Sequence, residues 1–140
     1  MTAKTYSPAD VAVIYGGAII SGFANGTFIT VSRDEDAFMK SVGADGEVCR
    51  SRNANRSGSI TLTLLQSSAS NDVMSAFAAA DALSGAVPLP ILIKDNTGTT
   101  LVGADAAWIK KDPDIVRSKE VESVEWVLDC SQIVSFIGGH

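Results

Sequence analysis

Side chains that could act as an acid, a base or a nucleophile are few in this chain and lie far apart. His140 is the single histidine and also the last residue, a position that is normally frayed. Cys49 has Arg50 and Arg52 nearby, and such cations favour a reactive thiolate, but no histidine stands beside it to act as a base. We therefore expect no catalytic site and interpret the chain as a protein that is not an enzyme.

The acidic residues are clustered, but their spacing does not fit a metal site. Asp34, Glu35 and Asp36 are adjacent, so their side chains point in different directions and cannot all converge on one ion. Asp112 and Asp114 have the spacing of a fragment of a calcium-binding loop, whose glycine and distal glutamate are missing here. No phosphate-binding loop or dinucleotide motif is present either, so the sequence predicts no metal and no cofactor.

Length and composition are those of an ordinary globular chain with few charges. The 140 residues, 46% of them hydrophobic and 19% charged, have the usual size of one domain spanning residues 1–140. The net charge of −5 argues against binding nucleic acid by neutralising phosphates, but not against a surface over which DNA passes without sticking. Neither a signal peptide nor a run of about 20 apolar residues is seen, so we expect a cytoplasmic product with no membrane span.

The first third of the chain alternates short apolar runs with glycine. Residues 11–15 form one such run, and Gly16-Gly17 is a natural turn. Asn25-Gly26 predicts a β-hairpin that joins residues 19–23 to residues 27–32. The second of these strands has apolar side chains on both faces, which indicates a strand covered on one side by its own core and on the other by something else.

A long charged stretch follows, from residue 33 to residue 57. Acidic residues fill its first part and arginines its end. Loops of this length are uncommon in compact domains and are usually functional or disordered. One interpretation is a solvated, mobile excursion. The other is an arm with an acidic and a basic end that docks on another subunit, and Phe38, Met39 and Val42 favour it because a solvated loop rarely carries such an apolar group.

Residues 59–66 and 121–130 predict two strands that each bury one face, because apolar side chains alternate with polar ones. Between them Ser70 is expected to cap a helix, Gly85 to end it, and Ala80 to complete its buried stripe. The residues expected in the core are Ile60, Leu62, Leu64, Val73, Phe77, Trp108, Trp126 and Leu128.

The remainder of the chain also predicts strands. Pro88 and Pro90 precede an apolar run at 91–93, which fits an edge strand better than a central one. Residues 95–98 predict a turn, residues 99–109 the returning strand, and the apolar tail 132–140 either completes its own sheet or reaches a neighbour's. The sum is about seven strands and one helix, an antiparallel α+β chain that is mainly β, built as a sandwich or a barrel.

Several strings, in order and over nearly the whole chain, resemble the tail tube proteins of contractile-tailed bacteriophages. They are ISGFA (20–24), GTFI (26–29), RDED (33–36), GADGE (43–47), RSGSITLTL (56–64), SND (70–72), AWI (107–109), KE (119–120) and EW (125–126). The resemblance implies a small β-barrel or sandwich with a flanking helix, shared with the tube protein of type VI secretion. It also implies six-membered rings that stack into a hollow tube, through which DNA passes during ejection.

The implied partners are other copies of the chain and the tail sheath, baseplate and tail terminator proteins. The expected location is the virion tail, assembled in the bacterial cytoplasm, with no membrane. The inner sheets of six copies would join edge to edge, and the implied inter-subunit strand is Thr27, Phe28, Ile29, Thr30, Val31 and Ser32. The implied interface loop consists of Arg33, Asp34, Glu35, Asp36, Phe38, Met39, Asp45, Glu47, Arg50, Arg52 and Arg56.

The sequence is also compatible with two other functions. One is a different structural component with the same fold, such as a tail terminator or a baseplate hub domain. The other is a monomeric β-barrel that binds a small apolar ligand, for which the sequence shows no distinctive set of converging polar groups.

Overall fold

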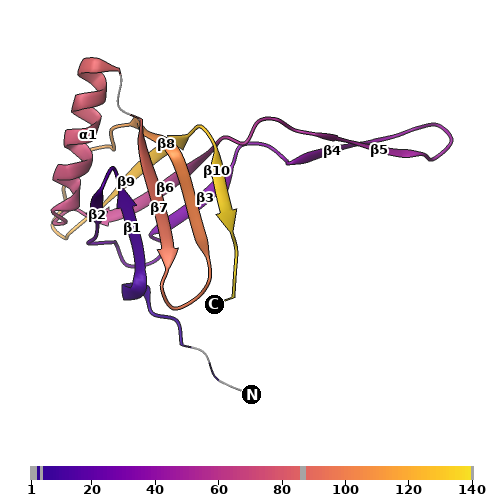
Figure 1. The fold of residues 1–140 in the computed structure, drawn as a ribbon. Helices are drawn as coiled ribbons and strands as arrows, with labels where there is room; N and C mark the ends of the chain where they lie inside the picture. Colours follow the sequence, from indigo (N-terminus) through magenta and orange to yellow (C-terminus); the bar gives the residue numbers. More distant parts are fainter. Residues whose placement is uncertain (1–2, 4, 86–87, 140) are drawn as a thin grey trace.

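The computed structural model describes residue 3, residues 5–85 and residues 88–139, and a large antiparallel sheet with one helix beside it dominates the structure (Figure 1). In chain order the elements are η1 (Pro8–Asp10), β1 (Val11–Tyr15), β2 (Ala18–Ile20), β3 (Ile29–Arg33), β4 (Phe38–Val42), β5 (Val48–Arg52), β6 (Gly58–Leu65), α1 (Ser70–Ser84), β7 (Leu89–Asp95), β8 (Leu101–Lys111), β9 (Ser123–Cys130) and β10 (Ile133–Phe136). The mainly β, antiparallel class with one flanking helix is confirmed. The described residues form more strands than the seven or so expected.

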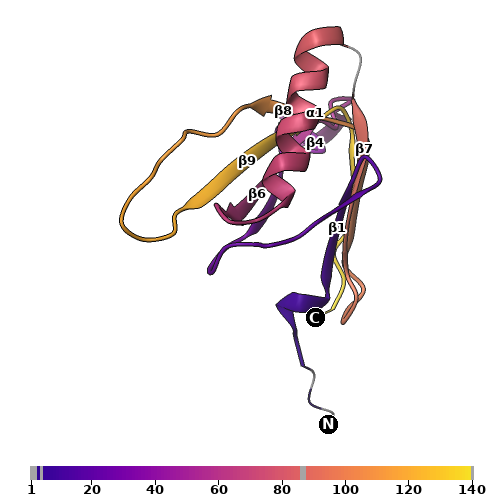
Figure 2. The same cartoon turned by 90° about the vertical axis from the view of Figure 1, so that its left-hand side faces the viewer.

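The main sheet has two layers because the long strand β8 belongs to both. Its first half, up to Ala107, pairs with β7 and β10, and its second half pairs with β9. The front layer is therefore β2-β1-β7-β8-β10, and the back layer is β8-β9-β6-β3. Figure 2 shows both layers from the side, with α1 beside the space between them.

The core lies between these layers and follows from the alternation along the strands. Ile60, Leu62 and Leu64 of β6 are fully buried, and they face Trp126 and Leu128 across the ladder to β9. Val73 and Phe77 of α1 also pack against this cluster. Trp108 differs from the expectation of a core position: it is half-buried and points away from the core.

The expected hairpin at Asn25-Gly26 does not form, because β3 pairs with β6 instead. The segment before β3 also attaches to β6, through an isolated bridge between Phe23 and Leu64 and a bond from the Ala24 backbone N–H to the Thr63 oxygen. The hairpin of this region lies earlier, between β1 and β2. Its turn is Gly16-Gly17, where φ is 60° and 85°, the left-handed conformation that a two-residue hairpin turn requires.

Ser70 was expected to be the N-cap of the helix, but it is instead the first residue of the helix. The N-cap position is Ala69, which makes no side-chain cap bond, while the buried Ser70 hydroxyl accepts a hydrogen bond from the Ser21 backbone N–H (2.9 Å). Ala80 is exposed, and the fully buried residue of the helix stripe is Met74. The helix ends as predicted at Gly85, whose φ of 63° is favourable for glycine.

The strand after the prolines is an interior strand and not an edge. β7 pairs with β1 on one side and with β8 on the other. Pro90 is tolerated there because the β7–β8 register shifts between Leu89 and Ile91, so that the missing N–H falls at a bulge. The C-terminal tail completes its own sheet, since Ile133 to Phe136 pair with β8.

Candidate subunit interface

Residues 33–57, expected as a loop, form an arm built from an ordered β-ribbon. β4 and β5 pair over five residues each, from Phe38↔Arg52 to Val42↔Val48, and the ribbon projects from the body between β3 and β6 (Figure 1). The turn at its tip is closed by a bond from the Gly43 backbone N–H to the Glu47 oxygen (2.7 Å). Every residue from 32 to 52 is exposed. The arm is thus an extension of two strands of the back layer.

The arm has two faces of different chemistry, because directly opposed residues of an antiparallel pair share a face. The cationic face consists of Phe38, Lys40, Val42, Val48, Arg50 and Arg52. The neutral face consists of Met39, Ser41, Cys49 and Ser51. On the cationic face the guanidinium carbon of Arg50 lies 4.4 Å from the centroid of the Phe38 ring. Lys40, Val42 and Val48 were missing from the expected interface residues, although the alternation along 38–42 is visible in the sequence.

The base of the arm is held by a network of side-chain hydrogen bonds. Asn53 and Asn55 donate from their Nδ2 atoms to Glu35 Oε2, at 3.0 and 2.8 Å, and these bonds hold the pKa of the Glu35 carboxyl below its ordinary value. The Ser57 hydroxyl donates to Asp34 Oδ2 (2.8 Å). The carboxylates of Asp34 and Glu35 therefore accept hydrogen bonds from the returning segment 53–57 at the base of the arm.

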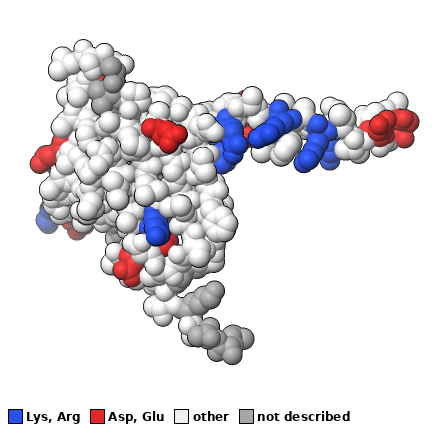
Figure 3. All heavy atoms as spheres, viewed as in Figure 1, with Lys and Arg blue, Asp and Glu red and all other residues white. Residues whose placement is uncertain are grey.

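The charges along the arm are arranged differently from the acidic and basic ends expected. The chain folds back on itself, so acidic residues lie at both ends, with Asp34 to Asp36 at the base and Asp45 and Glu47 at the tip. The cations Lys40, Arg50 and Arg52 occupy the shaft between them, and Figure 3 shows the basic shaft and the acidic tip. Arg33 and Arg56 lie at the base, where Arg33 reaches Ser135 Oγ at 3.4 Å.

β3 is an edge strand of the back layer, with β6 as its partner within the described residues. Ile29 and Val31 point inward and pack against the core, while Thr30 and Ser32 are exposed on the outward face. The strand is thus apolar on one face only, which corrects the expectation for 27–32. Thr27 and Phe28 precede the strand, and the Phe28 ring packs on Phe23 with centroids 5.0 Å apart.

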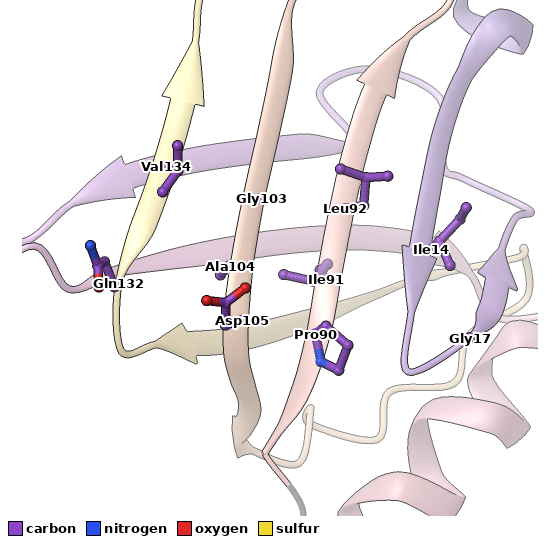
Figure 4. A pocket seen from close by; sticks show the side chains of 10 residues that line it. All are labelled: Ile14, Gly17, Pro90, Ile91, Leu92, Gly103, Ala104, Asp105, Gln132 and Val134. Atoms are coloured by element: carbon purple, nitrogen blue, oxygen red, sulfur yellow. The ribbon is translucent and has the colours of Figure 1, made fainter.

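The outward face of the front layer is apolar and nearly uncharged. One row in register across its strands consists of Ile19, Ile14, Leu92, Gly103 and Val134. A shallow depression of about 420 Å³ lies over this row, where Gly103 leaves space between Leu92 and Val134 (Figure 4). Asp105 and Gln132 are the polar side chains among its lining residues, which leaves few groups to orient a small ligand.

The residues considered for chemistry do not gather in one place. Cys49 is exposed on the arm, whereas Cys130 is buried. Across the ranges 5–85 and 88–139, no three side chains of His, Cys, Asp or Glu come together as metal ligands would. His140 lies outside the described residues.

Residues 3–138 match the family described as the bacteriophage PhiTE tail tube protein. The chain belongs to this family. The chain is also 32% identical over 145 residues to structural protein ORF10 of Pseudomonas phage KPP10. That alignment covers 98% of this chain and 84% of the relative.

The tail tube fold of the chain is shared with parts of contractile injection systems. One similar structure is the tube-terminating cap of the anti-feeding prophage, with a TM-score of 0.64, 14% identity and coverage of 97% of this chain and 93% of that one. The sheath/tube terminator of the extracellular injection system PVC has a TM-score of 0.65 at 14% identity, covering 98% and 100%. A chain of the PVC sheath–tube complex has a TM-score of 0.63 at 14% identity, covering 94% and 91%.

Among the helices of the described residues, none is long and apolar enough to cross a membrane.

Proposed function

We propose that this chain is the subunit of six-membered rings that stack into the hollow inner tube of a phage tail. In this role the protein is a component of the virion, its partners are copies of itself together with sheath, baseplate and terminator proteins, and DNA passes through the lumen. It has no catalytic task. Membership of the tail tube family supports the proposal, and so does a fold shared with a sheath–tube complex.

The arm is the observation that carries the proposal. An isolated two-stranded hairpin is at best marginally stable in water. This one exposes Phe38, Met39, Val42 and Val48, with 47% to 61% of each side chain accessible. Such a ribbon gains stability when a second surface covers it, and a neighbouring copy in the same or an adjoining ring is the surface that a tube supplies.

In this proposal the shaft and the base of the arm have different roles. The cationic face provides charges and apolar contact for docking. The base residues Asp34, Glu35, Asn53 and Asn55 fix the direction in which the arm points. The net charge of −5 suits passage of DNA, because a neutral or acidic lumen repels phosphate.

A tube terminator is the second candidate. Two of the similar structures are a tube-terminating cap and a sheath/tube terminator. A terminator ends a stack, whereas a tube subunit must offer complementary surfaces on both sides of its ring, so that stacking repeats without closing.

Negative-stain electron microscopy of the purified protein over a range of concentrations separates these functions. A tube subunit gives rings that stack into tubes about 80–100 Å wide, roughly two domains and a pore across. Single rings that never lengthen indicate a terminator. A strictly monomeric protein at every concentration contradicts both.

A further inference from the structure

Asn25-Gly26 does not form the expected hairpin turn and lies instead in the exposed loop between β2 and β3. The φ of Gly26 is 103°, a conformation that favours glycine, and a Cβ added there would meet no atom within 4 Å. Within the described part of the chain, the Gly26 N–H makes no hydrogen bond. The backbone nitrogen of Gly26 is therefore open to attack the side chain that precedes it.

The side-chain amide of Asn25 is also the least restrained of its kind. The chain has five asparagines, and Asn25 is the one that glycine follows. Hydrogen bonds hold the side-chain amides of three others, Asn53, Asn55 and Asn71. Asn96 is exposed, but the β-branched side chain of Thr97 crowds the nitrogen that follows it. Asn25 makes no side-chain hydrogen bond to any residue that the structure describes.

We propose that Asn25 is a site of spontaneous covalent modification, where the chain deamidates through a cyclic imide. The Gly26 backbone nitrogen loses its proton to hydroxide and bonds to Cγ of Asn25. The Cγ–Nδ2 bond then breaks, and Nδ2 takes a proton from water and leaves as ammonia, which regenerates the hydroxide. Glycine favours this ring closure because it has no side chain beside the attacking nitrogen. The inference does not depend on the ring assembly proposed above.

Water opens the imide ring in either of two ways. Addition at Cγ breaks the new bond and gives aspartate with the ordinary backbone. Addition at the α-carbonyl carbon of residue 25 breaks the original peptide bond and gives isoaspartate, whose backbone continues through Cβ and Cγ. Both products add one negative charge to the net charge of −5. Isoaspartate also adds one atom to the backbone before Gly26.

Both ends of the loop that contains Asn25 are fixed to Thr63 of β6. The Ala24 backbone N–H donates to the Thr63 oxygen (3.0 Å), and the Thr63 N–H donates to the Phe28 oxygen (2.9 Å). The rings of Phe23 and Phe28 pack on each other with centroids 5.0 Å apart. The chain from residue 24 to residue 28 therefore has a fixed distance to span.

The two products should differ in their effect on this loop. Aspartate changes the charge of an exposed side chain and leaves the length of the loop as it is, so both bonds to Thr63 should remain. Isoaspartate lengthens the loop, and we expect it to loosen these bonds. Because β3 begins at Ile29, directly after the loop, the start of this strand should loosen as well.

Peptide mapping of the whole protein, stored folded at mildly alkaline pH, tests the proposal. Trypsin releases residues 5–33 as one peptide, in which Asn25 is the single side-chain amide because no other asparagine and no glutamine lies there. We expect this peptide to gain the mass of an amide-to-acid change at least about tenfold faster than peptides 53–56, 57–94 and 95–110, which carry the other asparagines. Freshly purified protein gives the baseline. A gain in 5–33 that is no faster than in the other peptides overturns the proposal.

Two variants separate the chemistry from its consequence. Asn25→Gln must close a larger ring, so its peptide 5–33 should stay unchanged over the same period, and conversion at the wild-type rate would contradict the imide route. Asn25→Asp carries the new charge on an ordinary backbone. Hydrogen exchange of the Thr63 amide, followed by NMR, should be about tenfold or more faster in aged protein that contains isoaspartate than in Asn25→Asp. Equal exchange rates would show that the longer backbone does not loosen the loop.

Discussion

Arg50 lies over the ring of Phe38, with its guanidinium carbon 4.4 Å from the ring centroid, on a ribbon whose residues are all exposed. The contact joins β5 to β4 across the cationic face and keeps a positive charge and an aromatic ring side by side. A surface of this kind is complementary to an acidic and partly apolar partner, as the proposed docking of the arm requires. The two faces of the arm can therefore be tested separately.

Replacing Arg50→Gln and Arg52→Gln together removes two positive charges from the cationic face. We expect the protein concentration needed for assembly to rise by about tenfold or more, equivalent to about 1.4 kcal/mol, because the docking surface loses its charges. The free energy of unfolding should change by less than about 0.5 kcal/mol, since both side chains are exposed. Light scattering against concentration and thermal unfolding measure the two effects.

The matched control places the same change of net charge on the neutral face. Ser41→Glu with Ser51→Glu adds two negative charges and leaves the cationic face intact. We expect this variant to assemble more readily than the double glutamine variant. Equal loss of assembly in both variants would mean that the total charge of the arm matters and not the face.

The base of the arm should respond to acid through Glu35. Its pKa is lowered because Asn53 and Asn55 donate hydrogen bonds to the charged form. A pKa that is lower in the folded than in the unfolded chain gives stability that is present above the unfolded value and is lost as the pH falls through the folded one. We therefore expect the side-chain amide resonances of Asn53 and Asn55 to shift in NMR spectra at a pH below the ordinary carboxyl range.

The variant Glu35→Gln is the control for this titration. It keeps an acceptor oxygen near both asparagines but cannot lose a proton in this range. The acid-induced shift should disappear in the variant. A shift that persists unchanged would assign the titration to another carboxyl, and the proposed locking of the arm by Glu35 would be wrong.

Tyr15 should make the stability of the body sensitive to alkali. The Tyr15 hydroxyl donates to the Ala107 oxygen (2.9 Å), and burial raises the pKa of Tyr15 from 10.0 to about 12. The stabilisation is present below the unfolded pKa and is lost as the pH rises through the folded one, a window of about 10 to 12. Tyr15→Phe should cost about 1 kcal/mol at neutral pH and flatten the stability curve in this window. Parallel curves for wild type and variant would contradict this role.

The two cysteines should differ sharply in reactivity. Cys49 is exposed on the neutral face of the arm, while Cys130 is 1% exposed and burial raises the pKa of its thiol to about 11. An Ellman-type reagent should modify one thiol quickly in the folded protein and a second only after denaturation. The fast reaction should vanish in Cys49→Ser. Two thiols of equal rate in the native protein would contradict the burial of Cys130.

Strands that bury one face in their own core were the part of the fold that the sequence pattern predicted well. In β6 the alternation of Ile60, Leu62 and Leu64 with threonine identifies the buried face, because a period of two is enforced by the sheet. The arm was missed as a ribbon for the opposite reason. Neither face of β4 or β5 is buried within the chain. Cations and apolar residues are therefore mixed along these strands, and the sequence pattern predicts a charged loop.

Local signals failed where a tertiary contact outweighed them. Asn25-Gly26 is a strong hairpin signal, but β3 pairs with β6, whose residues lie from 25 (Arg33↔Gly58) to 33 (Ile29↔Leu62) positions further along the chain. Ser70 has the residue type of a helix cap, but its hydroxyl binds the Ser21 N–H and is buried.

The most direct test of the account is a cryo-electron microscopy reconstruction of the assembled protein. We expect six copies per ring, rings stacked into a tube, and each arm lying on a neighbouring copy with its cationic face covered. Assemblies in which the arm stays in solvent or folds onto its own body would contradict the central claim that the arm joins subunits.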